Sequence, residues 1–288
     1  MRHSSYLMIS LITLAASGLL LGLWHFRDQS LAERQRDGTI RIGYAIEPPY
    51  ALLKPGGQVS GVFPEVARQL TSELGIQQVE WIQADFDALI PGLEAGRFDV
   101  IAAGMYITRE RAQRVAFSEP LLHVQQGLLV RAGNPLELSS YQEAVSRPEV
   151  RLAVIAGAVE EGLLRRIGVP EGQIVVVPDA STGRAAVENG VADGLALSSP
   201  TICIMAARDE LGQTTVAQPF EQPDPAFAQG NGYAAFAFRM ADRQLLAAWN
   251  IALRSFVGSP EHLQLMVEFG LSEAESPGSI TTAEILSP

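Results

Sequence analysis

Between residues 39 and 269, segments with the apolar pattern of a β-strand alternate with segments that have the apolar pattern of an α-helix. Short apolar runs rich in β-branched residues predict strands, and apolar residues that recur every three or four positions predict helices. In the first half of the chain the predicted strands are 39–46, 79–82, 100–103 and 127–131, and the predicted helices are 63–74, 86–95 and 110–117. In the second half the strands are 150–155, 174–177, 194–197, 216–219 and 233–238, and the helices are 159–167, 182–188, 200–211, 244–256 and 261–269.

Strands that alternate with helices form parallel sheets covered by helices on both faces. Two such series in one chain therefore predict an α/β protein with two lobes. No short fixed-period repeat is present, which excludes a solenoid. The last residues are rich in Ser, Pro, Gly and Thr, and we expect this tail to be loosely ordered.

An apolar stretch over residues 6–24 follows Arg2 and His3. At 1.5 Å per residue, a helix of that length approaches the thickness of a bilayer's hydrocarbon core. The stretch is either an uncleaved anchor or a signal peptide cleaved after Ser30-Leu31-Ala32, and its length slightly favours the anchor. Both alternatives predict that the rest of the chain is exported. The chain's one cysteine, Cys203, lies far beyond the stretch, which excludes a lipoprotein anchor.

Composition narrows the function further. Of the 288 residues 47% are hydrophobic, which is enough for packed cores, and the net charge is −11 with acidic residues scattered along the chain. Nucleic-acid binding needs a concentrated basic face, so it is not expected. A single cysteine excludes a disulfide, and the dispersed histidines have no metal-ligand spacing. We expect no metal and no cofactor, and we expect Cys203 to be buried in a helix.

Four motifs then resemble one family, the amino-acid-type (family 3) periplasmic solute-binding proteins of ABC importers. They are EPPY at 47–50, GVFPEVA at 61–67, IPGLEAGRFD at 90–99, and AGMYITRER at 103–111 followed by FSEP at 117–120. The resemblance implies a type II periplasmic-binding-protein-like fold, with two α/β lobes joined by two crossing strands and preceded by one hydrophobic helix. It implies lobe 1 at 39–128 plus 233–275 and lobe 2 at 129–232. The apolar stretch and the polar tail described above add an anchor or signal at 1–32 and a loosely ordered tail at 276–288. It also implies a monomer that delivers solute to an ABC permease in the inner membrane.

Within this family the chain is most similar to the ectoine/hydroxyectoine-binding proteins. The similar segments are DFDALIPGL at 85–93, GNPL at 133–136 and IVVVPD at 174–179. The resemblance implies a ligand held between the lobes and trapped by hinge closure.

Candidate ligand contacts lie near the ends of predicted strands. Arg111 follows the strand end at Gly104, and its planar fork suits a ligand carboxylate; the alternative is a solvated arginine, as Arg109 is expected to be. Glu47 follows the first strand and could meet a ligand cation; the alternative is an exposed loop charge. The aromatic residues Tyr50, Phe86 and Tyr106 stand at strand-to-helix junctions, where ring faces could attract a delocalised cation. The alternative for each ring is core packing.

Lobe 2 departs from the family pattern. In the segment Gly157-Ala158-Val159-Glu160, Val159 stands where a hydroxyl residue usually binds the ligand carboxylate, and Glu160 follows it as a further candidate contact. Ser198 stands where the family has an aspartate for an α-ammonium group. The missing aspartate disfavours a standard α-amino acid and fits an ectoine-like or betaine-like zwitterion, although the missing hydroxyl counts against ectoine itself.

Two other functions compete with solute capture for transport. One is a cyclohexadienyl-dehydratase-like enzyme on the same fold, with Glu160 or Asp179 as the general acid. The other is a membrane-anchored ligand sensor or accessory module.

Overall fold

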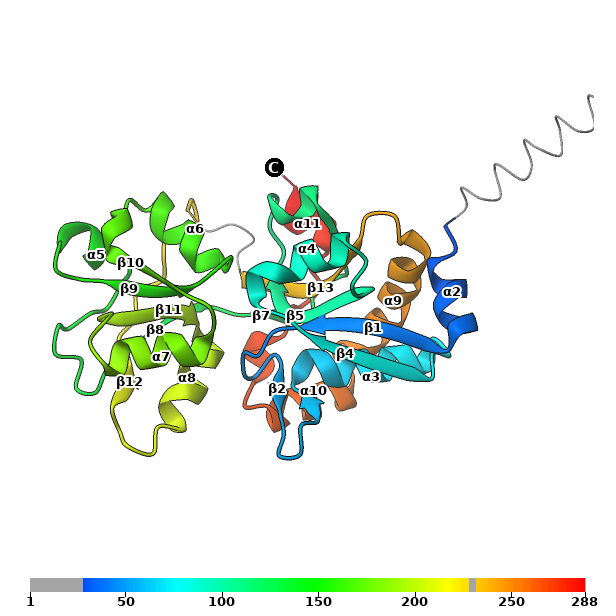
Figure 1. The fold of residues 1–288 in the computed structure, drawn as a ribbon, viewed down its shortest axis with the longest axis horizontal. Helices are drawn as coiled ribbons and strands as arrows, with labels where there is room; N and C mark the ends of the chain where they lie inside the picture. Colours follow the sequence, from blue (N-terminus) through cyan, green and yellow to red (C-terminus); the bar gives the residue numbers. More distant parts are fainter. Residues whose placement is uncertain (1–27, 228–231, 288) are drawn as a thin grey trace, which may run out of the picture.

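The computed structural model describes residues 28–227 and 232–287. These residues form two α/β lobes that lie side by side, each built around its own sheet (Figure 1). The chain builds most of lobe 1, crosses to lobe 2 near residue 125, and then returns to complete lobe 1. The α/β fold with two lobes is therefore confirmed.

The sheet of lobe 1 combines strands from both ends of the described chain. Its strands are β1 (Thr39–Tyr44), β4 (Gln78–Gln83), β5 (Val100–Tyr106), β6 (Val115–Phe117), β7 (Leu122–His123) and β13 (Tyr233–Arg239), and a separate hairpin contains β2 (Leu52–Leu53) and β3 (Val59–Ser60). The order is β4-β1-β5-β13-β6, with β7 also paired to β13. β1 is parallel to β4 and β5, whereas β13 is antiparallel to β5, β6 and β7.

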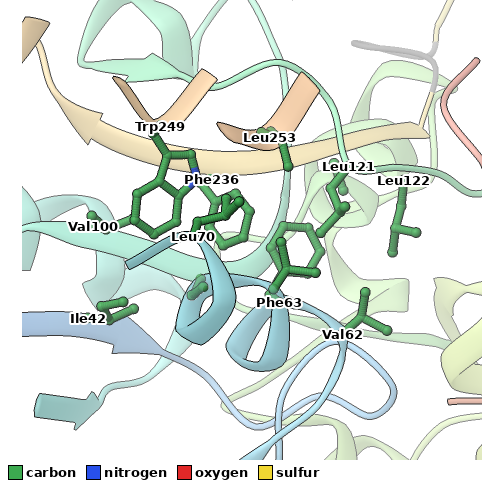
Figure 2. Packing of buried hydrophobic residues seen from close by; sticks show 14 of the residues in the cluster. Ile42, Val62, Phe63, Leu70, Val100, Leu121, Leu122, Phe236, Trp249 and Leu253 are labelled. Atoms are coloured by element: carbon green, nitrogen blue, oxygen red, sulfur yellow. The ribbon is translucent and has the colours of Figure 1, made fainter. Parts of the chain in front are cut away.

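Helices cover both faces of this sheet. They are α2 (Ser30–Asp37), α3 (Val62–Glu73), α4 (Leu89–Glu94), α9 (Arg243–Phe256), α10 (Pro260–Glu268) and α11 (Thr282–Leu286), with 3₁₀ turns η1 (Phe86–Ala88), η2 (Arg111–Gln113) and η5 (Glu273–Glu275). Alternate residues of β5 face opposite sides: Val100 packs in a core with α3 and α9, and Ile101 in a core with α4. Figure 2 shows the first core, where Trp249 and Phe63 both pack on Phe236.

Lobe 2 has the same layered organisation. Its sheet order is β10-β9-β11-β8-β12. The elements are β8 (Gln126–Arg131), α5 (Glu143–Ser146), β9 (Leu152–Ile155), α6 (Val159–Arg166), η3 (Glu171–Gln173), β10 (Ile174–Val177), α7 (Ala180–Glu188), β11 (Gly194–Ser198), α8 (Ser199–Ala207) and β12 (Thr214–Val216). β9 is parallel to β10 and β11, so the carboxyl ends of all three point the same way.

Two segments cross between the lobes, one leading into β8 and one leading back to β13. Their side chains tie them together, because Gln126 and Gln222 exchange two hydrogen bonds. The backbone N–H of Gln126 donates to Oε1 of Gln222 at 3.0 Å, and Nε2 of Gln222 donates to the carbonyl of Gln126 at 2.9 Å. The two crossing segments are thus hydrogen-bonded to each other between the lobes.

Residues 110–117 differ from the helix predicted there. The structure has the short turn η2 and then the strand β6, and Phe117 pairs with Ala237 of β13. The hydrogen-bonding partner of β6 is β13, which comes from the other end of the chain. The apolar spacing of residues 110–117 therefore could not predict this pairing. The helix predicted over 200–211 also ends early, at Ala207.

The tail at 276–288 is not loosely ordered within the described residues. Thr281 caps α11 in a capping box with Glu284. Thr282 donates a hydrogen bond to the carbonyl of Ser118, and Ile285 and Leu286 pack against lobe 1. Figure 1 shows α11 lying beside α4. Apolar contacts with the sheet therefore hold a segment that its composition marked as a loop.

Cys203 is exposed, contrary to the expected burial. In α8 the buried positions are Thr201 and Ile202, so the cysteine points away from the core. The helix is apolar on every side, and its sequence therefore did not indicate which face would be covered.

The N-terminal end of the described chain is part of lobe 1. α2 packs against α9, and the backbone N–H groups of Gln244 and Leu245 donate to the side chains of Asp28 and Ser30. These contacts satisfy the free N–H groups at the start of α9. The apolar stretch at 6–24 lies outside the described residues, and no helix within them is long and apolar enough to cross a bilayer.

Candidate functional site

The carboxyl ends of parallel strands from both lobes meet at the interlobe boundary. Glu47 and Tyr50 follow β1, Tyr106 ends β5, and Ser198 ends β11. In α/β sheets this edge is where ligands bind, because loops there carry the side chains outward. The structure thus brings together residues that the sequence placed about 150 positions apart.

Tyr50 is positioned by Gly104. A Cβ at residue 104 would lie 2.7 Å from the Tyr50 ring, and φ there is +65°, so this position requires glycine. The ring also packs edge-on against Phe63 and is only 1% exposed. Tyr50 therefore presents its hydroxyl, and not its ring face, to the cleft. That hydroxyl donates to Oγ of Ser198 in lobe 2 at 2.8 Å.

Glu47 is buried among hydroxyl groups. Its Oε1 accepts a hydrogen bond from Thr201 Oγ1 at 3.0 Å and a longer one from Ser198 Oγ at 3.5 Å. Both donors belong to lobe 2, so the carboxylate of lobe 1 is bound across the boundary. The hydroxyl of Ser198 thus donates to a carboxylate of the same protein.

Arg111 also bridges the lobes. Its Nη1 donates to the carbonyl of Tyr106 at 3.0 Å, and its Nη2 donates to the carbonyl of Gly157 in lobe 2 at 2.9 Å. The guanidinium lies 5.4 Å from the centre of the Phe86 ring. Arg111 is therefore not a solvated helix-start arginine, whereas Arg109 is exposed.

Phe86 and Val159 both pack across the boundary. Phe86 contacts the cores of both lobes, and Val159 packs against the core of lobe 1 although it begins a helix of lobe 2. One face of the Phe86 ring meets Arg111. Together with the buried Tyr50 ring, this means that the three predicted aromatic residues do not form an open box in this arrangement.

Glu160 and Tyr106 occupy the centre of the boundary. Glu160 lies in the first turn of α6 and is 3% exposed. The hydroxyl of Tyr106 is buried and has no hydrogen-bond partner among the described residues. A buried hydroxyl without a partner costs about 1–3 kcal/mol, so such groups commonly face a ligand.

Burial dominates the electrostatics of these groups. It raises the pKa of Glu47 to about 8, aided by the charge of Glu160, while the hydroxyls of Thr201 and Ser198 act in the opposite direction. Burial raises the pKa of Glu160 to about 6, with its own backbone N–H, Gln126 and Arg111 lowering it in part. Burial also lowers the pKa of Arg111 to about 10. The cleft therefore favours neutral carboxyl groups more than water does.

Cavities open along the boundary and differ in charge. One of about 290 Å³ is lined by Arg111, Arg165 and Arg166, with Phe86 and Gly157. A second, of about 160 Å³, is lined by Glu47, Asp85 and Asp179, again with Phe86. A third, of about 240 Å³, is lined by polar and apolar groups that include Tyr106, Gln126 and Val159. The first cavity is also lined by Arg114 and by the acidic residues Asp87, Glu110 and Glu161. Phe86 thus lines both a cavity of mixed charge, with one excess positive side chain, and an acidic cavity.

Sequence reasoning missed Thr201, Gln126 and Tyr141. Thr201 binds Glu47, and the hydroxyl of Tyr141 donates to the carbonyl of Gly127 beside Glu160. Thr201 lies in an apolar run, and the other two have no motif around them, so only their spatial neighbours identify them. Among the described residues no cluster of His, Cys, Asp or Glu could hold a metal ion.

Ionisable side chains from both lobes, among them Glu47, Arg111 and Glu160, thus lie along one interlobe boundary. Residues 40–270 match the family model of bacterial extracellular solute-binding proteins, family 3. The chain therefore belongs to this family and has its two-lobed type II periplasmic-binding fold.

Individual relatives support this family assignment. The chain is 33% identical, over 84% of its length and 80% of the relative's, to a probable amino-acid ABC transporter periplasmic-binding protein, y4tE, of Sinorhizobium fredii. It is 26% identical to the lysine/arginine/ornithine-binding periplasmic protein of Escherichia coli, over 75% of this chain and 81% of the relative. The crystal structure of EhuB in complex with hydroxyectoine is 31% identical, with a TM-score of 0.82 over 91% of this chain and 99% of that one. The protein is thus a solute-binding protein of the amino-acid ABC importer type.

Proposed function

We propose that this protein captures a small zwitterionic solute between its lobes by hinge closure and delivers it to an ABC permease in the inner membrane. The observation that carries the proposal is that the half-buried guanidinium of Arg111 and two buried carboxyl groups, those of Glu47 and Glu160, lie at one interlobe boundary. In this role Arg111 binds the ligand carboxylate and the acidic groups face the ligand cation.

Ectoine and hydroxyectoine are the first candidate ligands. A delocalised cation is weakly hydrated and can be held by carboxylates without a dedicated ammonium site. The proposed contacts are Glu47, Tyr50, Phe86, Gly104, Tyr106, Arg111, Val159, Glu160 and Ser198. The likeness to a hydroxyectoine-bound protein supports this choice.

A thermal-shift screen tests the ligand class. The panel contains ectoine, hydroxyectoine, glycine betaine and proline betaine beside glutamine, arginine and histidine. A tight ligand at 100 times its Kd adds about 2.7 kcal/mol to the free energy of unfolding. If only a common α-amino acid stabilises the protein, the ectoine proposal is wrong and the transport role remains.

We further propose that the protein acts as a monomer outside the cytoplasm and stays attached to the membrane through residues 6–24. The contacts of Asp28 and Ser30 with α9 support this, because cleavage after Ala32 would cut α2 and remove both. Membrane fractionation followed by N-terminal sequencing tests it. A mature chain that begins at Glu33 would refute the anchor and leave export intact.

An anchored receptor could also pass its signal to a separate sensor protein. The absence of permease genes next to the gene for this protein would favour that role.

A second candidate activity is a cyclohexadienyl-dehydratase-like reaction. The observation in its favour is the buried carboxyl of Glu160, whose pKa of about 6 suits a general acid at neutral pH. Asp179, the other candidate acid, lines the acidic cavity beside Glu47. Incubation with prephenate and arogenate tests the reaction, and unchanged substrates would leave solute binding as the function.

A further inference from the structure

Residues 271–287 lie beyond the part of the chain that the family model matches, yet they fold against lobe 1. Two capping boxes, formed by Ser272 with Glu275 and by Thr281 with Glu284, start the short helical turns η5 and α11. The loop just before α11 lines a cavity of about 300 Å³ beside α9. The attachment of this end of the chain to the lobe therefore depends on α11 more than on the loop.

Both ends of α11 contact one stretch of lobe 1, which runs from Arg109 to Glu119. At the start of the helix, the backbone N–H of Thr282 donates to Oε2 of Glu119 at 2.9 Å, and its hydroxyl donates to the carbonyl of Ser118. At the other end, the carbonyl of Ser287 accepts a hydrogen bond from Arg109. Because the side chain of Arg109 is exposed to water, we expect this last bond to contribute little.

Between these contacts lies the turn η2, which carries Arg111. The backbone N–H groups of Arg111 and Ala112 both donate to Thr108, at 3.1 and 2.9 Å. A single 3₁₀ turn has little stability of its own, so contacts with the rest of the lobe must fix it. Ile285 and Leu286 of α11 pack against the same core as Ala112. The helix thus supports the turn through this core as well as through the hydrogen bonds of Thr282.

Arg111 depends on an accurately placed backbone, because its guanidinium reaches both lobes. Its Nη1 donates to the carbonyl of Tyr106 and its Nη2 to the carbonyl of Gly157 across the boundary. A planar fork binds a carboxylate through two parallel hydrogen bonds, and such a site tolerates a displacement of only about 0.5 Å. A small shift of η2 would therefore weaken both the interlobe contact and the carboxylate site.

We propose that α11 is a positioning element of the ligand site, which holds residues 109–119 in place and thereby sets the orientation of Arg111. The inference rests on the proposed function only in taking Arg111 as the contact for the ligand carboxylate. It assigns a role in ligand affinity to Thr282 and Leu286, although neither lines an interlobe cavity.

Calorimetry on the full chain in detergent micelles tests this role, with ectoine and L-arginine as the probes. Thr282→Val/Leu286→Ala removes a hydrogen bond and an apolar contact of α11, and it should lower affinity about tenfold. Leu265→Ala is the matched control, because Leu265 is a half-buried leucine of α10 that packs against the other core of lobe 1. It should lower stability and leave affinity unchanged. Leu286→Met, which preserves the apolar contact, should bind as the unsubstituted protein does.

A double-mutant cycle separates positioning from a general loss of stability. In an Arg111→Lys background, Thr282→Val/Leu286→Ala should change affinity by less than about twofold, because the fork that α11 orients is already absent. Equal losses in the two backgrounds would refute the link between α11 and Arg111.

Hydrogen exchange gives a readout that needs no ligand. In the empty protein, Thr282→Val/Leu286→Ala should speed exchange of the amide N–H groups of Arg111 and Ala112 about tenfold, whereas Leu265→Ala should not. If exchange is faster and no solute of the panel binds, the support of η2 by α11 stands and the proposed ligand class fails. If a solute binds with unchanged affinity, α11 is refuted as a positioning element and the transport function stands, whether or not exchange is faster.

Discussion

Two sites in this protein bury carboxylates, and they do so in opposite ways. At the far end of lobe 1, Asp99 is 1% exposed and meets three arginines: Arg41 at 2.8 Å, Arg239 at 3.1 Å and Arg34 at 3.2 Å. At the interlobe boundary, Glu47 and Glu160 are about as deeply buried and meet only hydroxyl and amide groups.

The pKa values record the difference. Burial alone would raise the pKa of Asp99, but hydrogen bonds from Arg41, the charge of Arg34 and a hydrogen bond from Arg239 lower it below its usual value. In the cleft, burial prevails and both pKa values rise. A carboxylate whose partners are built into the protein stabilises the fold, whereas one whose partner is missing is available to a ligand. Substitutions at four positions test this contrast.

The largest effect is expected at Arg111, the charge that the cleft offers to the ligand carboxylate. Arg111→Ala should lower affinity at least 100-fold, a loss of about 2.8 kcal/mol or more, because the ligand's charge would be buried without a partner. Arg111→Lys should also weaken binding strongly, since an ammonium cannot reproduce the planar fork. Calorimetry measures both, with the exposed Arg109→Ala as control. Equal losses at 109 and 111 would contradict the assignment.

Asp99→Asn tests the other half of the contrast. We expect the free energy of unfolding to fall by about 2–3 kcal/mol, less than for a fully buried pair because the arginines keep some contact with water. Ligand affinity should not change. Since the folded pKa of Asp99 is lowered, its contribution is complete above about pH 4 and is lost as pH falls further. Urea unfolding at pH 7 and pH 3 measures this, and an equal deficit at both pH values would oppose the ionic explanation.

Phe86→Ala should have an intermediate effect confined to the cleft. Phe86 lines both the cavity of mixed charge and the acidic cavity and packs against both lobes, so its removal costs packing as well as a cation–π contact. We expect a loss of about 1–3 kcal/mol in ligand binding, measured by calorimetry. Phe227→Ala removes a partly exposed ring and serves as control. Unchanged affinity after Phe86→Ala would exclude the ring from the site.

The smallest effect on stability is expected from a substitution of Ser30, which lies in α2 of lobe 1 and not in the cleft. Ser30→Ala removes an acceptor for the backbone N–H of Leu245 at the start of α9. We expect unfolding to become easier by about 1 kcal/mol, as for other helix caps, with ligand affinity unchanged. Urea unfolding measures the loss. A stability equal to that of the unsubstituted chain would show that the hydrogen bond from Leu245 to Ser30 contributes nothing to the stability of lobe 1.

The sequence by itself determined the fold class and the position of the site along the chain. Apolar spacing located most strands and helices, because strand and helix periods are local properties. The motifs at 47–50 and 103–111 placed Glu47 and Arg111 at strand ends, and the strand ends of an α/β sheet share one edge. Both predictions depend on residues that are close together in the chain, so a single sequence is enough to make them.

Only the tertiary structure decided which strands pair and which polar groups form hydrogen bonds with one another. The strand β6 exists because β13 pairs with it from more than 100 residues away, and α11 is held by contacts with lobe 1. Thr201 of lobe 2 donates a hydrogen bond to Glu47 of lobe 1, and the sequence around neither residue predicts this contact. Hydrogen bonding and desolvation depend on distances in space, so the unpaired state of the cleft carboxylates appears only once both lobes are folded and closed.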